Sequence, residues 1–354
     1  MKTFTIAVIA GDGVGPEVVP QGKRILEAVG KRHKVTFAFE DFDWGAEHYF
    51  RWGSMMPAGA IDLLQPCDAI YLGAVGHPQI PDHITLNGLL LPIRRVFDQY
   101  ANMRPAYLYP GVDSPLAGRK GGEIDFVVVR ENTEGEYAQV GGFVYHQQPE
   151  EVAIQTSVFT RRGIERVVRF AFQLAVKRNQ KKKVTSVTKS NAQSYSMVLW
   201  DRTFQEVAAH YPDVETESLL VDAAAMNFIR RPQSFDVVVA SNLFGDILSD
   251  LSAAIIGSMG LAASANLDPE RRFPSMFEPV HGSAPDIAGK GIVNPLAAIL
   301  SAAMMLEHLE MTAAAREVET AVAAVLAEGK VRTPDLGGKS STEEVAGAVL
   351  EKLA

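Results

Sequence analysis

Short apolar runs alternate with amphipathic helical patterns along most of the chain. Apolar residues in the short runs predict strands at 5–10, 69–73, 124–130, 184–188, 218–222 and 235–241. Between them, apolar residues at helical spacing predict helices at 16–29, 163–177, 195–209 and 295–308. A further helix is expected near Ser341, where Glu344 completes a capping box. This alternation predicts an α/β fold.

Two segments rich in glycine and proline interrupt the pattern, and they indicate where the chain passes between domains. The first is Arg104–Gly122 and the second is Gly257–Gly260. We therefore expect a discontinuous layout. Residues 1–103 and 257–354 would form one large domain, and residues 104–256 a smaller one.

Composition narrows the class of protein. The 354 residues are 47% hydrophobic and 21% charged, which is ordinary for a globular protein. A net charge of −8 argues against a nucleic-acid-binding surface. Cys67 is the single cysteine, so no internal disulfide is possible and a reducing cytoplasm is expected. The N-terminus begins with a strand pattern and no apolar run is long enough for a bilayer, so we expect no membrane association.

Asp246 and Asp250 are the most informative pair of side chains. They follow an apolar strand and a turn at Gly245, and their spacing places both carboxylates on one face of a helix. No basic residue lies at helical spacing to neutralise them. A hard cation such as Mg²⁺ or Mn²⁺ would relieve the repulsion. The alternative is a solvated helix face, or a first turn in which acids favour the helix dipole.

Two glycine-containing segments are candidates for binding a cofactor. Gly11–Pro16 follows the first strand, but its third glycine comes one residue too early for a dinucleotide fingerprint, so a Rossmann fold is not expected. A tight turn near the cofactor or the active cleft fits it better. His281–Pro295 combines small residues with Asp286, which could accept hydrogen bonds from a ribose diol and repel a 2′-phosphate. The alternative is an elaborate surface loop.

Several isolated residues have a chemical and a structural interpretation. Arginine forks bind carboxylates, and Arg94, Arg104 and Arg130 lie near turns and away from obvious acidic partners, although Glu131 could pair with Arg130. Three further residues follow predicted strands. Tyr137 and Lys189 could transfer protons, and the default role of Asp222 is a helix N-cap.

Together these segments resemble the metal-dependent β-decarboxylating dehydrogenases, the isocitrate and 3-isopropylmalate dehydrogenase family. The resemblance spans almost the whole chain, and it is most specific in Asn242–Asp250 and Phe277–Gly289. It implies an isopropylmalate dehydrogenase-like two-domain fold, with a large mixed sheet flanked by helices. The large domain would bind NAD, and the smaller one would carry the metal ligands and the dimer interface.

The resemblance also implies a role for each matching residue. Mg²⁺ or Mn²⁺ would be held by Asp246, Asp250 and the Asp222 of a partner subunit, and a monovalent cation such as K⁺ is compatible with the family. Arg94, Arg104 and Arg130 would clamp the substrate carboxylates, with Asp222 beside them. A partner's Lys189 would relay the proton of the 2-hydroxyl, and Tyr137 would protonate the carbon that loses CO₂. The expected NAD contacts are Glu278, His281, Gly282, Ser283, Ala284, Asp286, Ile287 and Asn294.

The substrate is expected to be a small hydroxy acid. The mostly apolar segment Asn87–Pro92 precedes Arg94 and disfavours isocitrate. Further similarity to the tartrate and D-malate dehydrogenase branch occurs in 76–86, 97–100 and 264–271. The expected reaction is the NAD-dependent oxidation and decarboxylation of a (2R)-malate-type acid by a cytoplasmic homodimer with shared active sites. Isopropylmalate is the alternative substrate, and a non-catalytic regulatory role is the alternative function.

Overall fold

The computed structural model describes residues 2–354 and divides the chain into two compact units. Unit 1 comprises residues up to Gln99 together with Arg104–Ile124 and Ser252–Ala354. Unit 2 comprises Tyr100–Met103 and Asp125–Leu251. These ranges differ from the expected domains mainly in Arg104–Ile124, which belongs to unit 1. This segment packs closely against unit 1. At Gly111, for example, the main chain of Leu326 is so near that a side chain would collide with it.

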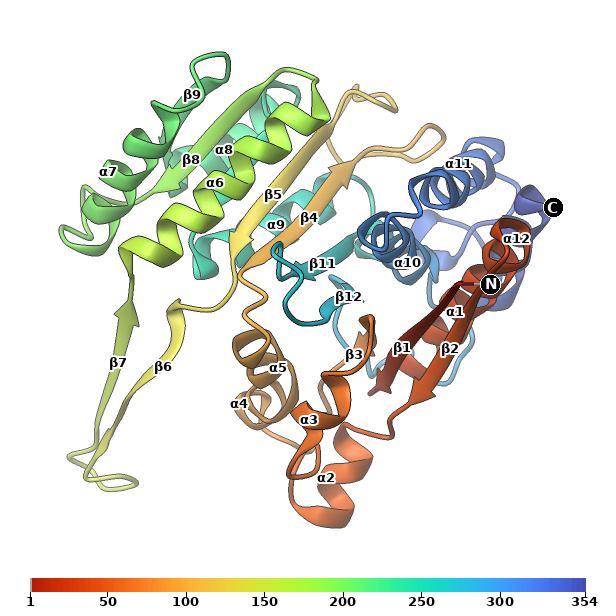
Figure 1. Ribbon diagram of the computed structural model, residues 1–354, viewed down its shortest axis with the longest axis horizontal. Helices are drawn as coiled ribbons and strands as arrows, with labels where there is room; N and C mark the ends of the chain where they lie inside the picture. The colour runs from red at the N-terminus through yellow and green to blue at the C-terminus, as the bar shows by residue number, and fades with distance from the viewer. Residues whose placement is uncertain (1) are drawn as a thin grey trace. The chain divides into compact units, whose positions relative to one another are not determined.

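Unit 1 is built on a mixed sheet with the strand order β2-β1-β3-β12-β11 (Figure 1). Its strands are β1 (Lys2–Gly11), β2 (Val35–Asp41), β3 (Ala69–Ala74), β11 (Ala263–Leu267) and β12 (Ser275–Pro279). Neighbours pair in parallel, except that β11 and β12 are antiparallel. Strand β4 (Ala101–Tyr107) contains the passage from unit 2 to unit 1. The expected α/β class with a mixed sheet is confirmed.

The helices of unit 1 pack around a buried apolar core. The long helices are α1 (Gly15–His33), α10 (Leu296–His308), α11 (Thr312–Glu328) and α12 (Thr342–Leu353). Helix α12 begins with the predicted capping box between Ser341 and Glu344. The shorter elements are α2 (Ala46–Trp52), α3 (Ala60–Leu64), α4 (Asp82–Thr85), the π-helical turn η1 (Leu86–Leu90), α5 (Leu91–Val96), η3 (Met259–Leu261) and η4 (Pro334–Leu336).

Unit 2 has a parallel sheet with the order β5-β10-β8-β9. Its strands are β5 (Asp125–Glu131), β8 (Lys183–Thr188), β9 (Glu215–Leu220) and β10 (Val237–Ala240). Its helical elements are α6 (Arg161–Arg178), α7 (Ser196–Ala208), α8 (Val221–Arg230), η2 (Pro232–Ser234) and α9 (Asn242–Ile255), of which the last continues into unit 1. The rings of Phe126, Phe228 and Phe235 pack together inside the unit.

A two-stranded antiparallel ribbon extends from unit 2, formed by β6 (Gly135–Val144) and β7 (Val152–Val158). Figure 1 shows it running away from the other strands of the unit. Most of its residues are exposed on both faces. This ribbon, Gly135–Val158, is called the arm below. Among the helices of residues 2–354, none has the length and apolar content needed to cross a membrane.

Candidate functional site

The best-defined cluster of predicted residues lies at the carboxyl ends of β5 and β10. These strands are parallel neighbours, and Arg130 is in register with Ala240. Helix α9 begins two residues after Ala240, so its first turns face the side chain of Arg130. A Cβ atom at Gly245 would lie 2.6 Å from the Cβ of Arg130. Gly245 therefore allows the close approach of α9 to β5, and α9 begins at Asn242, three residues earlier than the glycine suggested.

The Arg130 guanidinium is buried and held by two side chains of α9. Its Nε and Nη2 donate to Asn242 Oδ1 at 2.9 and 2.7 Å, and its Nη1 forms an ion pair with Asp246. The acidic partner of Arg130 is therefore Asp246 and not Glu131, the neighbour that the sequence offered. The partner is 116 positions away in the chain, beyond any local pattern. Glu131 instead accepts hydrogen bonds from the backbone N–H groups of Thr133 and Glu134.

Asp246 links this arginine to Tyr137. The Tyr137 hydroxyl donates to Asp246 Oδ2 at 2.7 Å, and the Arg130 guanidinium lies 5.1 Å from the centre of the Tyr137 ring. The sequence placed Tyr137 just after a strand. In the structure Tyr137 lies within β6. The carboxylate of Asp246 thus has a cation on one oxygen and a phenol on the other. Repulsion between Asp246 and Asp250 is relieved here by a residue from β5, which helical spacing could not reveal.

Asp222 and Lys189 form a second pair in unit 2. The register of β8 with β9 places Thr188 opposite Leu220, and the residues that follow bring Lys189 Nζ within 2.9 Å of Asp222 Oδ1. This hydrogen bond holds the pKa of the Asp222 carboxyl below its usual value. Asp222 lies in the first turn of α8, whose N-cap is Leu220. The N-cap role expected for Asp222 was therefore wrong, because β9 ends before it.

Two of the predicted metal ligands, Asp246 and Asp250, lie on the same helix. Asp246 and Asp250 are one turn apart on α9 and offer only carboxylate oxygens, which suits a hard divalent cation. In the described range 2–354, no three histidine, cysteine or acidic side chains come together as a metal site. The oxygen chemistry of the two carboxylates fits Mg²⁺ or Mn²⁺.

Arg94 and Glu278 form a buried ion pair in unit 1. Arg94 Nη2 donates to Glu278 Oε1 at 2.7 Å, and Asn266 Nδ2 donates to the same oxygen at 2.7 Å. The Nε of Arg94 is buried and has no hydrogen-bond partner among the described residues. A buried donor without an acceptor is costly, so this atom is a candidate contact for an anionic ligand. Arg104 is also buried, in β4.

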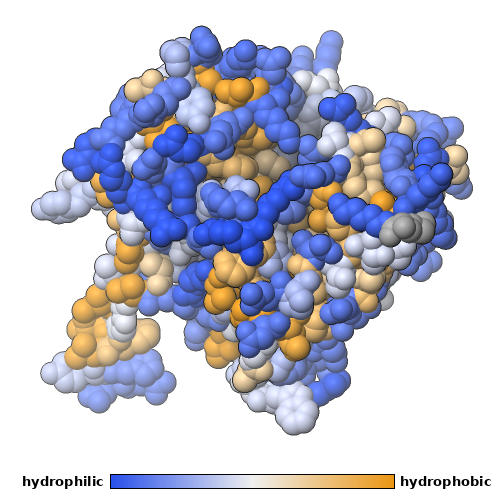
Figure 2. Space-filling model, in the orientation of Figure 1, coloured by the Kyte–Doolittle hydropathy of each residue, from blue (hydrophilic) through white to orange (hydrophobic). Residues whose placement is uncertain are grey.

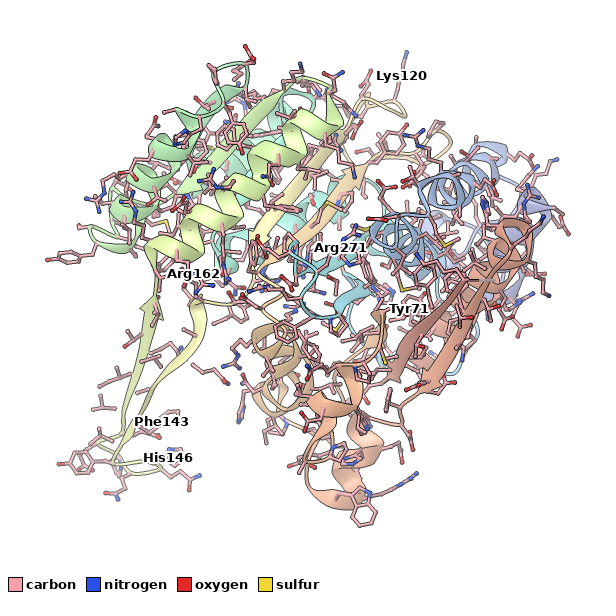
Figure 3. All side chains as sticks on the ribbon, in the orientation of Figure 1. Tyr71, Lys120, Phe143, His146, Arg162 and Arg271 are labelled. Atoms are coloured by element: carbon pink, nitrogen blue, oxygen red, sulfur yellow. The ribbon has the colours of Figure 1, made fainter. Side chains whose placement is uncertain are left out.

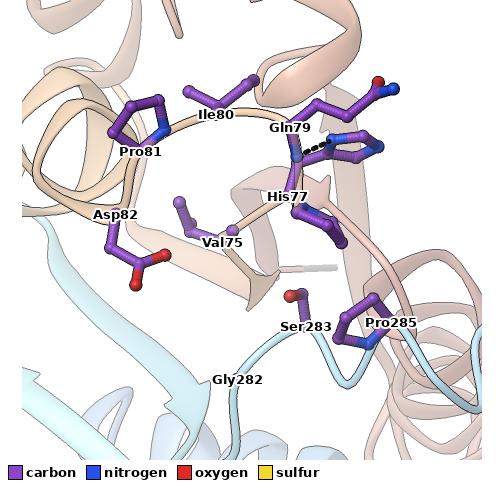
Figure 4. Close-up of a pocket in the computed structure, with 11 residues that line it drawn as sticks. Val75, His77, Gln79, Ile80, Pro81, Asp82, Gly282, Ser283 and Pro285 are labelled. Atoms are coloured by element: carbon purple, nitrogen blue, oxygen red, sulfur yellow. Dashed lines mark hydrogen bonds between the residues drawn. The ribbon is translucent and has the colours of Figure 1, made fainter.

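A cavity of about 710 Å³ lies beside the predicted cofactor loop (Figure 4). One wall is Val75–Asp82, and the other contains Gly282, Ser283 and Pro285. The sequence predicted Gly282 and Ser283 as cofactor contacts, whereas it marked residues 76–86 only as similar to the tartrate and D-malate dehydrogenase branch and gave them no role in binding the cofactor. The sequence did contain a pattern that could have indicated this wall, because Gly76 and Pro78 follow β3, a strand parallel to β1. In parallel sheets, loops after neighbouring strands meet at their carboxyl ends, where ligands bind.

The remaining cofactor candidates differ in their surroundings. Asp286 is exposed and Ile287 is half-buried, whereas Asn294 is buried and donates to Asp335 Oδ2 at 3.0 Å. Asn294 Oδ1 also accepts from the N–H of Leu296 at 3.0 Å, so its amide already supports the start of α10. Burial lowers the pKa of the His281 imidazole, and its Nε2 has no hydrogen-bond partner among residues 2–354.

The sequence from residue 5 to residue 349 matches the isocitrate/isopropylmalate dehydrogenase family. The chain belongs to this family and is an oxidative, decarboxylating dehydrogenase. It is 51% identical to a tartrate dehydrogenase/decarboxylase of Pseudomonas putida, over 99% of this chain and 98% of the relative. It is also 51% identical to the decarboxylating D-malate dehydrogenase of Escherichia coli K12, again over 99% and 98%.

Solved structures agree with the sequence relatives. The isocitrate dehydrogenase of Methylococcus capsulatus superposes with a TM-score of 0.88, at 38% identity and over 99% of both chains. The predicted fold, its assignment to this family and its likeness to the tartrate and D-malate dehydrogenases are thereby confirmed.

Proposed function

We propose that this protein catalyses the NAD-dependent, divalent-metal-dependent oxidation and decarboxylation of a (2R)-malate-type 2-hydroxy acid, D-malate or tartrate. The observation that carries the proposal is the Asp246 carboxylate, which joins Arg130 and Tyr137 one helical turn from Asp250. It brings together a metal ligand, an anion-binding cation and a proton donor. The names of the tartrate and D-malate dehydrogenase relatives support the substrate class.

The residues have distinct tasks in the proposed reaction. Asp246 and Asp250, with Asp222 of a second chain, would hold the cation. When bound, the cation supplies Lewis acidity and NAD accepts the hydride. Lys189 of the second chain takes the proton of the substrate 2-hydroxyl, and Tyr137 delivers a proton to the carbon that has lost CO₂.

Arginines orient the substrate in this proposal. Arg130 is fixed by Asn242 and Asp246, so little conformational entropy is lost when it meets a carboxylate. Arg94 offers its unpartnered Nε, and its Nη2 is already fixed by Glu278. Arg104 is the third predicted clamp residue, and its place in β4 restricts its backbone.

NAD rather than NADP is the proposed cofactor. Asp286 is exposed on the loop beside the cavity, where its negative charge would repel a 2′-phosphate and accept hydrogen bonds from a ribose. Glu278, His281, Gly282, Ser283, Ala284, Ile287 and Asn294 remain the other proposed contacts. The cavity volume of about 710 Å³ is within the range for cofactor sites.

The leucines before Arg94 are no evidence for a large apolar substituent on C3 of the substrate. Leu89 and Leu90 belong to the apolar core of unit 1, and Leu91 is also buried. They stabilise the fold, so their apolar character does not indicate a pocket for an isopropyl group. Isopropylmalate remains the second candidate because the leucine-rich segment Asn87–Pro92, with its proline, departs from the pattern expected of the tartrate and D-malate branch.

A homodimer with shared active sites completes the proposal. The arm exposes Phe143 and Ile154 by 62% and 57%, and Figure 2 shows hydrophobic surface along this ribbon. Met226 on α8 and Ile247 on α9 are also more than half exposed, on the helices that carry Asp222 and Asp250. Exposed apolar residues beside proposed metal ligands favour a second copy of this chain as the partner.

The test is NAD reduction followed by absorbance, with Mn²⁺ and each of D-malate, tartrate and isopropylmalate. We expect the highest kcat/KM with D-malate or tartrate, and no turnover after removal of divalent metal by a chelator. NADP in place of NAD is the cofactor control. Absence of turnover with all three acids would contradict the proposed reaction, and a preference for isopropylmalate would replace the proposed substrate.

A further inference from the structure

The turn between β1 and α1 contacts the end of β3, just before the first wall of the cavity, and Ser283 in the second wall. Asp12 N donates to Ala74 O at 2.8 Å, and Val14 N donates to Ser283 O at 2.9 Å. A Cβ atom at Gly13 would lie 1.9 Å from Ser283 O, so a glycine is needed for this approach. The segment that resembles an imperfect dinucleotide fingerprint therefore contacts protein segments on either side of the cavity.

The side chain of Asp12 holds the first wall. Its Oδ2 accepts from Gly76 N at 2.8 Å, and its Oδ1 accepts from Ala46 N at 2.6 Å. Asp12 is buried, which raises the pKa of its carboxyl, while the two backbone N–H groups act in the opposite direction. Both oxygens are thus used to fix backbone, and Gly76 belongs to the wall Val75–Asp82.

The side chain of Glu17 holds the predicted cofactor loop in the same way. Its Oε1 accepts from Gly289 N at 2.6 Å, and its Oε2 accepts from Gly291 N at 2.8 Å. Both glycines have positive φ angles, 77° and 64°, a conformation that leaves this segment without a regular hydrogen-bond ladder. One carboxylate therefore bridges two backbone amides that flank Lys290, between the proposed NAD contacts Ile287 and Asn294.

We propose that Glu17 is a positioning residue that fixes the loop Asp286–Asn294 through Gly289 and Gly291 and thereby sets the affinity for NAD. This proposal rests on the proposed function, because it assumes that this loop binds the cofactor. Charge-assisted hydrogen bonds are shorter and stronger than neutral ones, so a carboxylate is suited to this task. A loop that is already ordered loses less entropy when the cofactor binds.

Glu17→Gln tests the proposal with almost no change in size. Glutamine keeps one acceptor oxygen but turns an NH₂ group toward the other glycine N–H, so one hydrogen bond is replaced by two opposed donors. The matched control is Glu27→Gln on the same helix, because Glu27 is exposed. Glu17→Asp is the second variant, since it keeps the charge but shortens the reach.

The measurements are NAD affinity by calorimetry, steady-state kinetics, and hydrogen exchange of the 286–294 segment without cofactor. For Glu17→Gln we expect the Kd and KM for NAD to rise about tenfold. We also expect kcat at saturating NAD and the KM for the hydroxy acid to stay unchanged, and the amides of Gly289 and Gly291 to exchange faster. Glu27→Gln should behave as wild type.

Two outcomes would overturn the proposal. If Glu17→Gln binds NAD as tightly as wild type while wild-type binding is normal, Glu17 does not position the loop, and the proposed function survives. If wild-type protein binds no NAD, the proposed function fails together with the role of Glu17 in cofactor affinity. A fall in kcat or thermal stability with unchanged NAD affinity would indicate a purely structural role and would also contradict the proposal.

Discussion

Arg130 is a buried cation whose position depends on one neutral and one charged side chain. Asn242 accepts from two of its nitrogen atoms, and Asp246 compensates its charge. The Asn242 side chain also donates to Glu134 O at 3.1 Å, which fixes the orientation of the amide. Asn242 therefore positions the guanidinium, a role that the sequence did not assign to it.

Asp246→Asn removes the negative charge of this side chain and leaves its shape almost unchanged. We expect metal-dependent turnover to fall more than about 100-fold, because one anionic metal ligand is lost. The free energy of unfolding should fall by only about 1–2 kcal/mol, since the amide can still contact Arg130. Activity as a function of Mn²⁺ concentration and urea denaturation measure the two effects. Turnover that persists at wild-type level with Mn²⁺ would rule out Asp246 as a ligand.

Helix α9 lies close to strand β5 because Gly245 has no side chain. Gly245 lies against the Cβ and Cγ of Arg130, at 2.6 and 2.7 Å from an ideal Cβ position. A larger residue would push α9 away from β5 and separate Arg130 from Asp246. The glycine thus serves packing between elements rather than backbone freedom, since its φ angle is an ordinary one for a helix.

Gly245→Ala should therefore destabilise the protein although alanine favours helices. We expect a loss of about 1–3 kcal/mol in the free energy of unfolding, because the added methyl group overpacks the contact with Arg130. The matched control is Gly347→Ala in α12, where no atom lies within 4 Å of the new Cβ. That change should stabilise by up to about 1 kcal/mol. Equal effects in the two variants, measured by urea denaturation, would contradict this explanation.

The arm is an element without an apolar core of its own. Figure 3 shows the side chains of Phe143 and His146 near its tip, and the two rings lie 4.7 Å apart. A two-stranded ribbon is marginally stable alone in water, so a partner surface is expected to cover it.

Ile154→Asp tests whether the arm mediates assembly. A charge at this exposed apolar position should shift the protein from dimer toward monomer and lower turnover, because the proposed site takes Asp222 and Lys189 from a second chain. Analytical ultracentrifugation gives the assembly state. Val176→Asp on α6 is the control, since Val176 is similarly exposed, at 49% against 57%, but lies outside the arm. A variant that remains fully dimeric and active would exclude the arm from the interface.

At the scale of the whole molecule, the half-buried His308 contributes to the pH dependence of stability. Burial, together with the charge of Arg271, lowers the pKa of His308 to about 4, against the opposing charges of Asp268 and Glu310. The folded protein therefore keeps this imidazole neutral over a range in which the unfolded chain binds a proton.

His308 should make the protein less stable in mild acid. The unfolded pKa is about 6.5, so stability should decline as the pH falls from there toward 4, by about 1–2 kcal/mol between pH 7 and pH 5. His308→Gln removes this contribution, and its loss of stability over the same interval should be smaller by that amount. His210→Gln, at an exposed histidine, is the control. Parallel pH profiles of urea denaturation for wild type and His308→Gln would contradict the prediction.

Local sequence patterns predicted the positions of strands and helices better than they predicted which residues contact one another. The strands at β1, β3, β5, β8 and β10 and the capping box at Ser341 follow from spacings of a few residues. Strand β9 begins three residues earlier and ends two residues earlier than predicted, because Val221 continues the apolar run of Leu219 and Leu220 although it opens α8.

Contacts between distant segments could not be read from the sequence alone. Arg94 pairs with Glu278, which lies 184 positions away in the chain. Glu17 accepts a hydrogen bond from Gly289, which lies 272 positions away. These pairings depend on strand order and on how loops meet at a sheet edge. The predicted chemistry of Asp246 and Asp250 therefore came from residue types, whereas the supporting role of Asn242 required the fold.

The discontinuity of unit 1 has a consequence for synthesis on the ribosome. Strand β3 is fully buried and pairs with β12, with Ala69 opposite Ser275. Strand β12 is translated only after all of unit 2, about ten seconds or more later at roughly 5–20 residues per second. During that interval β3 can pair with β1, but the edge that faces β12 has no native neighbour. Nascent chains that stall before β12 should therefore need chaperone protection, whereas Asp125–Leu251 can already pair its own strands.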